Sequence, residues 1–389
     1  MKKVLLTSTA LVMTAGVAFA EVSPGVSLSG SAELGIKDKD GFGGADPDAG
    51  LQFHNDLDLD INFAAETDGG LAFGASIDLD EVGVGISADD GPAAAFISFG
   101  GFKLEMGDVD GALDLVNQEI GFLSSIDDDH TTHAGYFGGG GLDGGQDGQI
   151  ATLSYTGVPG LILAVSAEIG DVDTDDEIYG VGVQYNFDLG AVEIGASLGY
   201  QEGAYSFSAA GAGLEGATAT LTSIGIPTSA IAASGFAIGD LNGDAEIWAV
   251  SLELDTKTGF VARLNYADLE GNLDNVDWSY SSTIGLEFDG TPLTETVSVS
   301  GTPVSSLDIE WDYIGIGVLY ETGPWGFTAN YGEFDGNIEG FDFDADGFGL
   351  AVNYDLGGGA SVQFGYGSGE SFFDDESIDT WSFGLGMSF

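Results

Sequence analysis

Cysteine is absent from the 389 residues, and strongly basic residues are scarce. The absence of cysteine excludes disulfides and thiolate metal sites, so hydrogen bonding and packing must provide the stability. Only 7 Lys and Arg stand against 64 Asp and Glu, which gives a formal net charge of −57. Because so few bases are available to neutralise phosphates, nucleic acid is excluded as a partner.

Long apolar runs are also missing after the start of the chain. The first twenty residues, MKKVLLTSTALVMTAGVAFA, combine two lysines, an apolar stretch and small residues before Glu21. This layout predicts a cleaved signal peptide over residues 1–20 and export through the periplasm. No later segment approaches the ~20 continuous apolar residues of a membrane-spanning helix. Residues 21–389 contain no Pro-rich linker or break in composition, so we expect one domain.

Strict alternation of apolar and polar residues is what the chain does contain. In DLDLDINF (56–63), the residues Leu57, Leu59, Ile61 and Phe63 share one face of a strand, and Asp56, Asp58 and Asp60 share the other. Hydrophobic residues make up 43% and aromatic residues 11% of the chain, which argues against disorder. About sixteen alternating segments follow one another, an even number as in single-chain bacterial barrels.

The connections between these segments alternate between short and long. The short ones are ETDGG (66–70), Gly100-Gly101, GVPG (157–160), DLG (188–190), DTKTG (255–259), ETGP (321–324) and DLGGG (355–359), and the long ones include 109–149, 202–245 and 269–307. Tyrosines recur at strand ends on the apolar parity, where membrane-interface girdles place them. The sequence therefore predicts an all-β fold, a transmembrane antiparallel β-barrel of about 16 strands with short periplasmic turns and long extracellular loops.

Four segments carry a resemblance to a known family: LSGSAELGI (28–36), GGLAFGASIDLD (69–80), GFKLEMGD (101–108) and YDLGGGASVQFGYG (354–367). With the terminal Phe389, they resemble the alphaproteobacterial general diffusion porins of the Rhodobacter type. The resemblance implies an outer-membrane homotrimer in contact with lipid, and a third extracellular loop folded into the lumen as a constriction. That loop corresponds here to residues 109–149, and its matching acids are Asp110, Asp114, Glu119, Asp127, Asp128 and Asp129.

The barrel wall departs from the family pattern. Where the family has arginines on the second strand, this chain has Asp56 and Asp58, and the inward-facing bases are Lys103, Arg263 and Lys37, with Glu105 beside Lys103. Carboxylates that line a pore attract cations, so we expect a cation-selective channel for passive diffusion of small hydrophilic solutes and ions. The alternative is that the acids sit mostly on loops and reflect a saline habitat or solubility, which leaves the pore nearly neutral.

Other functions have weaker support in the sequence. No cofactor is expected, although acidic tracts such as DVDTDDE offer Asp171, Asp173 and Asp175 as candidate calcium ligands without the full EF-hand spacing. The three histidines, His54, His130 and His133, show no spacing that indicates an enzyme. A channel selective for one solute and a surface adhesin barrel with acidic loops remain as alternatives.

Overall fold

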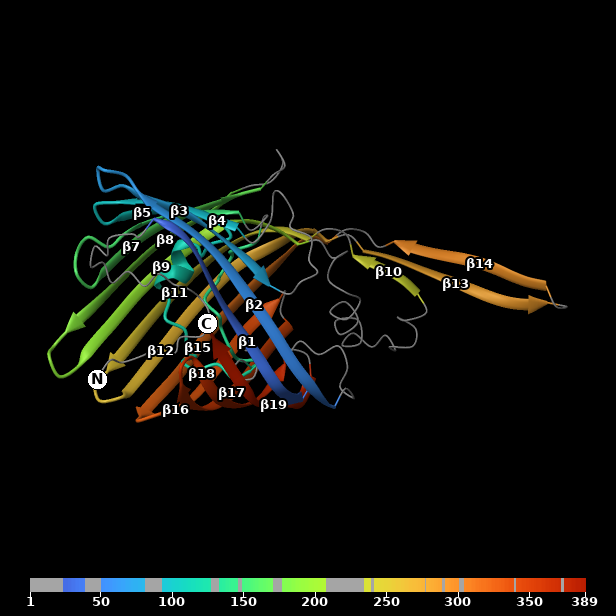
Figure 1. The fold of residues 1–389 in the computed structure, drawn as a ribbon. Helices are drawn as coiled ribbons and strands as arrows, with labels where there is room; N and C mark the ends of the chain where they lie inside the picture. The colour runs from blue at the N-terminus through green and yellow to red at the C-terminus, as the bar shows by residue number, and fades with distance from the viewer. Residues whose placement is uncertain are drawn as a thin grey trace.

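The computed structural model describes residues 24–38, 50–80, 93–126, 133–145, 149–170, 177–207, 234–238, 241–276, 278–288, 291–300, 304–338, 341–371 and 374–389. Sixteen strands close into one antiparallel barrel (Figure 1). They are β1 (Gly25–Asp38), β2 (Leu51–Glu66), β3 (Ala72–Asp80), β4 (Ala93–Phe99), β5 (Phe102–Gly107), β6 (Ile150–Tyr155), β7 (Leu161–Ile169), β8 (Glu177–Asp188), β9 (Glu193–Phe207), β11 (Leu241–Asp255), β12 (Phe260–Val276), β15 (Val304–Thr322), β16 (Trp325–Ile338), β17 (Phe341–Gly357), β18 (Ala360–Ser371) and β19 (Asp374–Ser388). The predicted fold is confirmed.

The alternating residues point as the sequence predicts. On β2, Leu57 and Leu59 are exposed on the outer face, whereas Asp56 and Asp58 are half-buried on the inner face. Large exposed apolar side chains recur on the outward parity of the other barrel strands. In water this surface would be unfavourable, so it fits a lipid environment.

Short turns join the strands at one end of the barrel, as predicted. Gly100 and Gly101 form the two-residue connection between β4 and β5, with φ angles of 61° and 90°. Both angles lie in the left-handed region that glycine adopts readily, and two such residues in succession suit a tight hairpin turn.

The long connections differ from the prediction, because several strands continue beyond their apolar alternation. The expected loop 269–307 contains the end of β12 together with β13 (Trp278–Phe288) and β14 (Thr291–Ser300), and the expected loop 202–245 contains the end of β9, β10 (Ser234–Ile238) and the start of β11. β10, β13 and β14 form a separate three-stranded sheet. Figure 1 draws β13 and β14 projecting away from the barrel.

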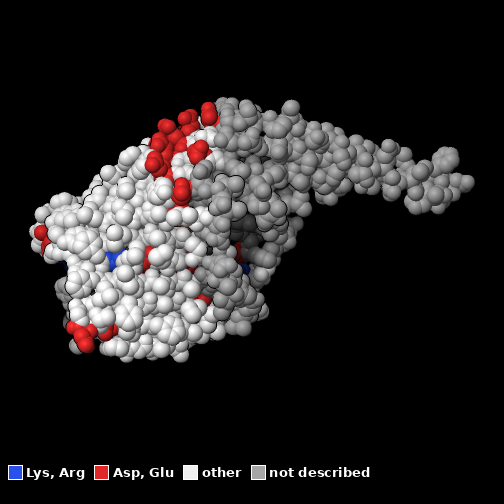
Figure 2. Space-filling model, turned by 90° about the horizontal axis from the view of Figure 1, so that it is seen from above, with Lys and Arg blue, Asp and Glu red and all other residues white. Residues whose placement is uncertain are grey.

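Acids occupy the outward positions of the extended strand ends. Glu202, Glu246, Glu270 and Glu310 are direct cross-strand neighbours on β9, β11, β12 and β15, and all four are exposed. Figure 2 shows a dense patch of acidic side chains, and a smaller group at the lower left, on an otherwise largely uncharged outer face. Apolar alternation marks where the outer face meets lipid, whereas hydrogen bonding continues past that level, so the sequence pattern underestimates strand length.

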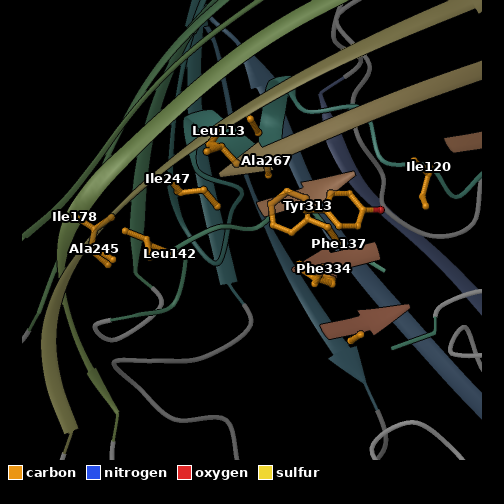
Figure 3. Packing of buried hydrophobic residues seen from close by; sticks show 12 residues of the cluster. Leu113, Ile120, Phe137, Leu142, Ile178, Ala245, Ile247, Ala267, Tyr313 and Phe334 are labelled. Atoms are coloured by element: carbon orange, nitrogen blue, oxygen red, sulfur yellow. The ribbon is translucent and has the colours of Figure 1, made fainter. Parts of the chain in front are cut away.

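The packed core lies inside the barrel. It joins Leu113, Ile120 and Phe137 of the segment after β5 to inward side chains that include Tyr313 and Phe334 (Figure 3). This segment contains the short helix α1 (Ala112–Val116). Among the described residues, no helix has the length and apolar character needed to cross a membrane.

Candidate functional site: the barrel lumen and its inner loop

The described residues 109–126 and 133–145, here called the inner loop, lie against the inward face of the barrel wall. Glycines on that wall make the close approach possible. A Cβ at Gly182 of β8 would lie 2.3 Å from the carbonyl oxygen of Ala112, and one at Gly317 of β15 would lie 2.0 Å from that of Ile120. The small residues on the inward parity therefore provide the surface on which the inner loop packs.

Hydrogen bonds join the two ends of the inner loop to each other and to the wall. The amide of Gly111 donates to Oδ2 of Asp143 at 2.7 Å, and Nε2 of Gln201 on β9 donates to Oδ1 of Asp143 at 2.5 Å. The amide of Leu142 donates to Oε1 of Gln201 at 2.7 Å. The amide of Gly144 donates to Glu168 of β7 at 3.0 Å. These bonds fix where the inner loop enters and leaves the wall.

The middle of the inner loop is held by β11 and β12. The amide of Gln118 donates to Oγ of Ser251 at 3.0 Å, and Nδ2 of Asn265 donates to the carbonyl oxygen of Gln118 at 3.1 Å. The Arg263 guanidinium donates through Nη1 to the carbonyl oxygens of Glu119 and Gly121, at 2.9 and 3.1 Å. The predicted wall base therefore contacts the inner loop directly.

Burial changes the charge state of the inner-loop acids. Burial, followed by the carboxylates of Asp110, Glu119 and Asp143, raises the pKa of Asp114 from 3.8 to about 8. Burial also raises the pKa of Asp143 to about 6, although the hydrogen bonds from Gly111 and Gln201 lower it. Asp114 is therefore mostly protonated at neutral pH, and the inner loop carries less negative charge than its acids suggest.

Two further predicted acids of the inner loop behave similarly. Burial, then the charges of Glu105 and Asp108, raises the pKa of Asp110. Burial also raises the pKa of Glu119, against the lowering effects of the Tyr136 hydroxyl and Arg263. The Tyr136 hydroxyl donates to Oε2 of Glu119 at 2.6 Å.

The wall formed by β1, β2 and β3 carries a ladder of carboxylates. The Ser31 hydroxyl donates to Asp58 at 2.5 Å, and the Ser29 hydroxyl donates to Asp60 at 3.2 Å. Asp60 is also the direct cross-strand neighbour of Asp78 on β3. Side chains paired in this way lie close together on one face, so the ladder concentrates negative charge on this part of the wall.

The wall bases lie next to acids. Nζ of Lys103 lies 2.6 Å from Oε1 of Glu105 on β5, and Nε of Arg263 lies 2.7 Å from Oε2 of Glu253 on β11. Lys37 lies on the inward parity near the end of β1. The structure does not bring Lys103 and Arg263 together as one basic cluster, because they stand on β5 and β12 and have separate acidic partners.

The remaining predicted site residues fall outside the described ranges. These are Asp127, Asp128 and Asp129 of the expected constriction, and the calcium candidates Asp171, Asp173 and Asp175. Within the described ranges, no three His, Asp or Glu side chains group as a metal site requires.

Sequence reasoning missed Asp143, Gln201 and Glu168, which fix the ends of the inner loop. Asp143 follows the glycine-rich run 138–141, which reads as flexible chain. Gln201 and Glu168 stand on the inward parity of β9 and β7, where any polar residue is compatible with a water-filled lumen. Their polarity alone could not show that they bind backbone amides of the inner loop.

Comparison with known proteins agrees with this geometry. Residues 7–371 match the model of the Gram-negative porin family. No curated protein sequence matches significantly. The fold is similar to that of a porin refined at 1.8 Å resolution, with 20% identity and a TM-score of 0.59 over 94% of this chain and 100% of that one. It is also similar to OmpT of Vibrio cholerae in its trimer form, with 14% identity and a TM-score of 0.57 over 94% of this chain and 100% of that one.

The likeness to a Rhodopseudomonas blastica porin triple mutant is weaker, with 18% identity and a TM-score of 0.50 over 94% and 100% of the two chains. These low identities bear on the fold alone, whereas the family match covers most of the sequence. Porins are channels rather than enzymes, and they reside in the bacterial outer membrane. The chain belongs to the Gram-negative porins.

Proposed function

We propose that this porin is a general diffusion channel for small hydrophilic solutes and ions, with a preference for cations. The observation that carries the proposal is the carboxylate ladder on the lumen wall, where Ser29 and Ser31 orient Asp60 and Asp58. Lys103 and Arg263 each lie against a carboxylate, so neither presents an isolated positive charge to a passing anion. A lumen with this balance favours cations.

Small solutes and ions cross such a channel by passive diffusion, without a chemical reaction. Sixteen strands enclose a lumen wide enough for water, and the inner loop narrows it from within. Hydrated cations move along the wall that carries Asp56, Asp58 and Asp60. In the described part of the chain, hydrogen bonds attach the inner loop to β6, β7, β9, β11, β12 and β17.

We also propose the homotrimeric state and the Rhodobacter-type assignment that the sequence resemblance implies. Three adjacent strands support an assembly, because β4, β5 and β6 have only 7, 6 and 6 residues, fewer than the ~9–11 that a strand needs to cross the bilayer. A hollow of about 570 Å³ spans these strands and their neighbours, and alanine is the commonest residue in its lining, with Ala75, Ala93, Ala95, Ala151 and Ala167 among the members. Strands too short to cross the bilayer, beside a hollow lined by small side chains, suit contact with a second copy of the chain better than contact with lipid.

Single-channel recording of the full-length protein in a planar bilayer tests the function. A salt gradient across the bilayer gives the reversal potential, and we expect its sign to indicate cation preference. An anion-selective reversal potential contradicts the selectivity. Saturation of the current by one solute favours the solute-selective channel, and a complete lack of conductance favours the adhesin.

A further inference from the structure

We infer that Arg263 determines the width of the channel by holding the inner loop on the wall. This attachment, rather than its positive charge, is its contribution to the channel. The inference rests on the proposed channel function and deepens it. It assigns a positioning role to a residue that the sequence places among the wall bases of the pore.

The guanidinium of Arg263 has a partner on each of its sides. Nη1 donates to the carbonyl oxygens of Glu119 and Gly121, and Nε donates to Oε2 of Glu253 at 2.7 Å. The central carbon of the guanidinium lies 4.3 Å from the centroid of the Phe122 ring, which places the cation over the aromatic face. The planar guanidinium of Arg263 therefore makes four contacts, and three of them are with the inner loop.

Neighbouring wall residues extend the same attachment. Glu253 is paired in register with Arg263, and Ser251 is paired in register with Asn265, so four inward side chains form a block on β11 and β12. Ser251 accepts the amide hydrogen of Gln118, and Asn265 donates to the carbonyl oxygen of the same residue. The block therefore holds the inner loop at Gln118, Glu119 and Gly121.

The attachment also keeps the adjoining part of the inner loop buried. Ile120 has no exposed surface, and its backbone carbonyl lies against Gly317 of β15. Ile120 lies between the two carbonyl oxygens that accept from Arg263. Losing the guanidinium leaves those two carbonyls without their charged donor, so this segment moves toward the lumen axis or becomes mobile.

Lysine cannot replace arginine at this position. The arginine fork presents several donors in one plane and stacks on a ring, whereas a lysine ammonium is a compact point charge. Arg263→Lys therefore keeps the charge and removes the geometry. A wall-charge role predicts that this variant behaves like the wild type, and a positioning role predicts that it behaves like Arg263→Gln.

The first experiment compares the wild type, Arg263→Lys and Arg263→Gln as full-length reconstituted channels. Lys257→Gln is the control for loss of one positive charge, because Lys257 lies in an exposed turn where it pairs with Asp188. We expect both Arg263 variants to change the mean open conductance by about 1.5-fold or more, with frequent sub-states, and the control to keep the wild-type value. Wild-type conductance in Arg263→Lys overturns the inference.

A second experiment follows the inner loop without measuring conductance. The chain has no cysteine, so a Gln118→Cys/Ser251→Cys pair can be introduced where the Gln118 amide and the Ser251 hydroxyl lie 3.0 Å apart. We expect disulfide formation to be about threefold slower or more when Arg263→Gln is added, because a detached loop samples the bonding geometry less often. Equal rates with and without Arg263 overturn the inference.

The cysteine pair also provides a rescue. Once the disulfide has formed in the Arg263→Gln background, the conductance should return to the wild-type value, and reduction should reverse the effect. A cross-linked channel that keeps the altered conductance contradicts the positioning role. If the wild type does not conduct at all, the proposed function fails, and the dependence of the disulfide rate on Arg263 still decides the positioning role. The circular dichroism of each variant establishes that its barrel has folded.

Discussion

Asp143 accepts the amide hydrogen of Gly111 at 2.7 Å, so a residue near the end of the inner loop holds its beginning. The other carboxylate oxygen accepts from Gln201 at 2.5 Å. In Asp143→Asn, an amide NH2 group that cannot accept a hydrogen bond replaces one carboxylate oxygen, so one of the two donors loses its acceptor. This loss weakens the attachment between the two ends of the inner loop by about 1–3 kcal/mol. Hydrogen exchange should show faster exchange of the Gly111 amide. Asp335→Asn, which changes an exposed acid on the outer face of β16, is the control and should leave that exchange rate unchanged.

Gly317→Ala should lift the inner loop off β15. The new Cβ would lie 2.0 Å from the carbonyl oxygen of Ile120, a separation that requires the backbone to move. Exposing Ile120 costs about 1.5–3 kcal/mol, so we expect a lower melting temperature and a changed conductance. Gly140→Ala is the matched control within the inner loop, because nothing lies within 4 Å of its added Cβ. Equal effects of the two substitutions would contradict the packing described here.

Stability should fall as the pH rises. The pKa values of Asp114 and Asp143 are raised to about 8 and about 6 in the folded protein, from an ordinary value of 3.8. The folded state therefore binds more protons than the unfolded state between these values. The stabilisation is complete below the ordinary carboxyl pKa and is lost as the pH rises through 6 and then 8.

We expect the melting temperature to drop between about pH 5 and pH 9, and Asp114→Asn to flatten the upper part of that profile. The control is Asp335→Asn, which changes an exposed acid on the outer face of β16. A profile that Asp114→Asn leaves unchanged would exclude Asp114 as the titrating group.

Selectivity should depend on where a negative charge stands rather than on the total charge. Asp58→Asn/Asp60→Asn removes two carboxylates from the lumen wall, and Glu246→Gln/Glu270→Gln removes two from the outer face. Salt screens exposed charges beyond ~10 Å at 0.1 M, so we expect the first pair to lower the cation-to-anion permeability ratio by about twofold or more and the second to leave it unchanged. Reversal potentials in a salt gradient measure both. Equal shifts would show that overall charge decides.

Ala95→Trp should impair trimer formation, because Ala95 lines the alanine-rich hollow on the short strands. A large ring there prevents close contact with a second copy. Ala329→Trp is the control, since Ala329 stands on the outward parity of β16 between Phe327 and Tyr331, where an added aromatic side chain faces lipid. Cross-linking in detergent or native mass spectrometry reads the oligomeric state. Intact trimers in Ala95→Trp would contradict an interface at β4–β6.

The barrel was predictable because lipid imposes a strict requirement on one side of each strand. Leu57 and Leu59 can face lipid only if Asp56 and Asp58 face inward, and this logic repeats around the barrel. The strand ends were not predictable in the same way. Above the lipid, Asp244 and Glu270 stand on the outer face without an apolar residue directly beyond them to reveal the period, although the backbone pairing continues.

The interior was less accessible to sequence reasoning. The alternation places Arg263 on the inward parity, but its partners Glu119 and Gly121 are more than 140 positions away in the chain. The identity of Asp143 gives no sign that it is buried, and burial is what shifts its proton affinity. Contacts of this kind depend on how the inner loop crosses several strands at once, and a period of two contains no information about that path.

The seam of the barrel sets the order in which the protein can assemble. The amide and carbonyl of Phe389 exchange hydrogen bonds with those of Gly30, both at 3.0 Å, and β19 pairs with β1 along the same line. The two partners are separated by nearly the whole sequence, so the cost in chain entropy of bringing them together is the largest in the fold. Until that step the sheet has two free edges that can pair with other chains. A chaperone or membrane machine that protects β1 during this interval would therefore prevent aggregation without affecting the finished channel.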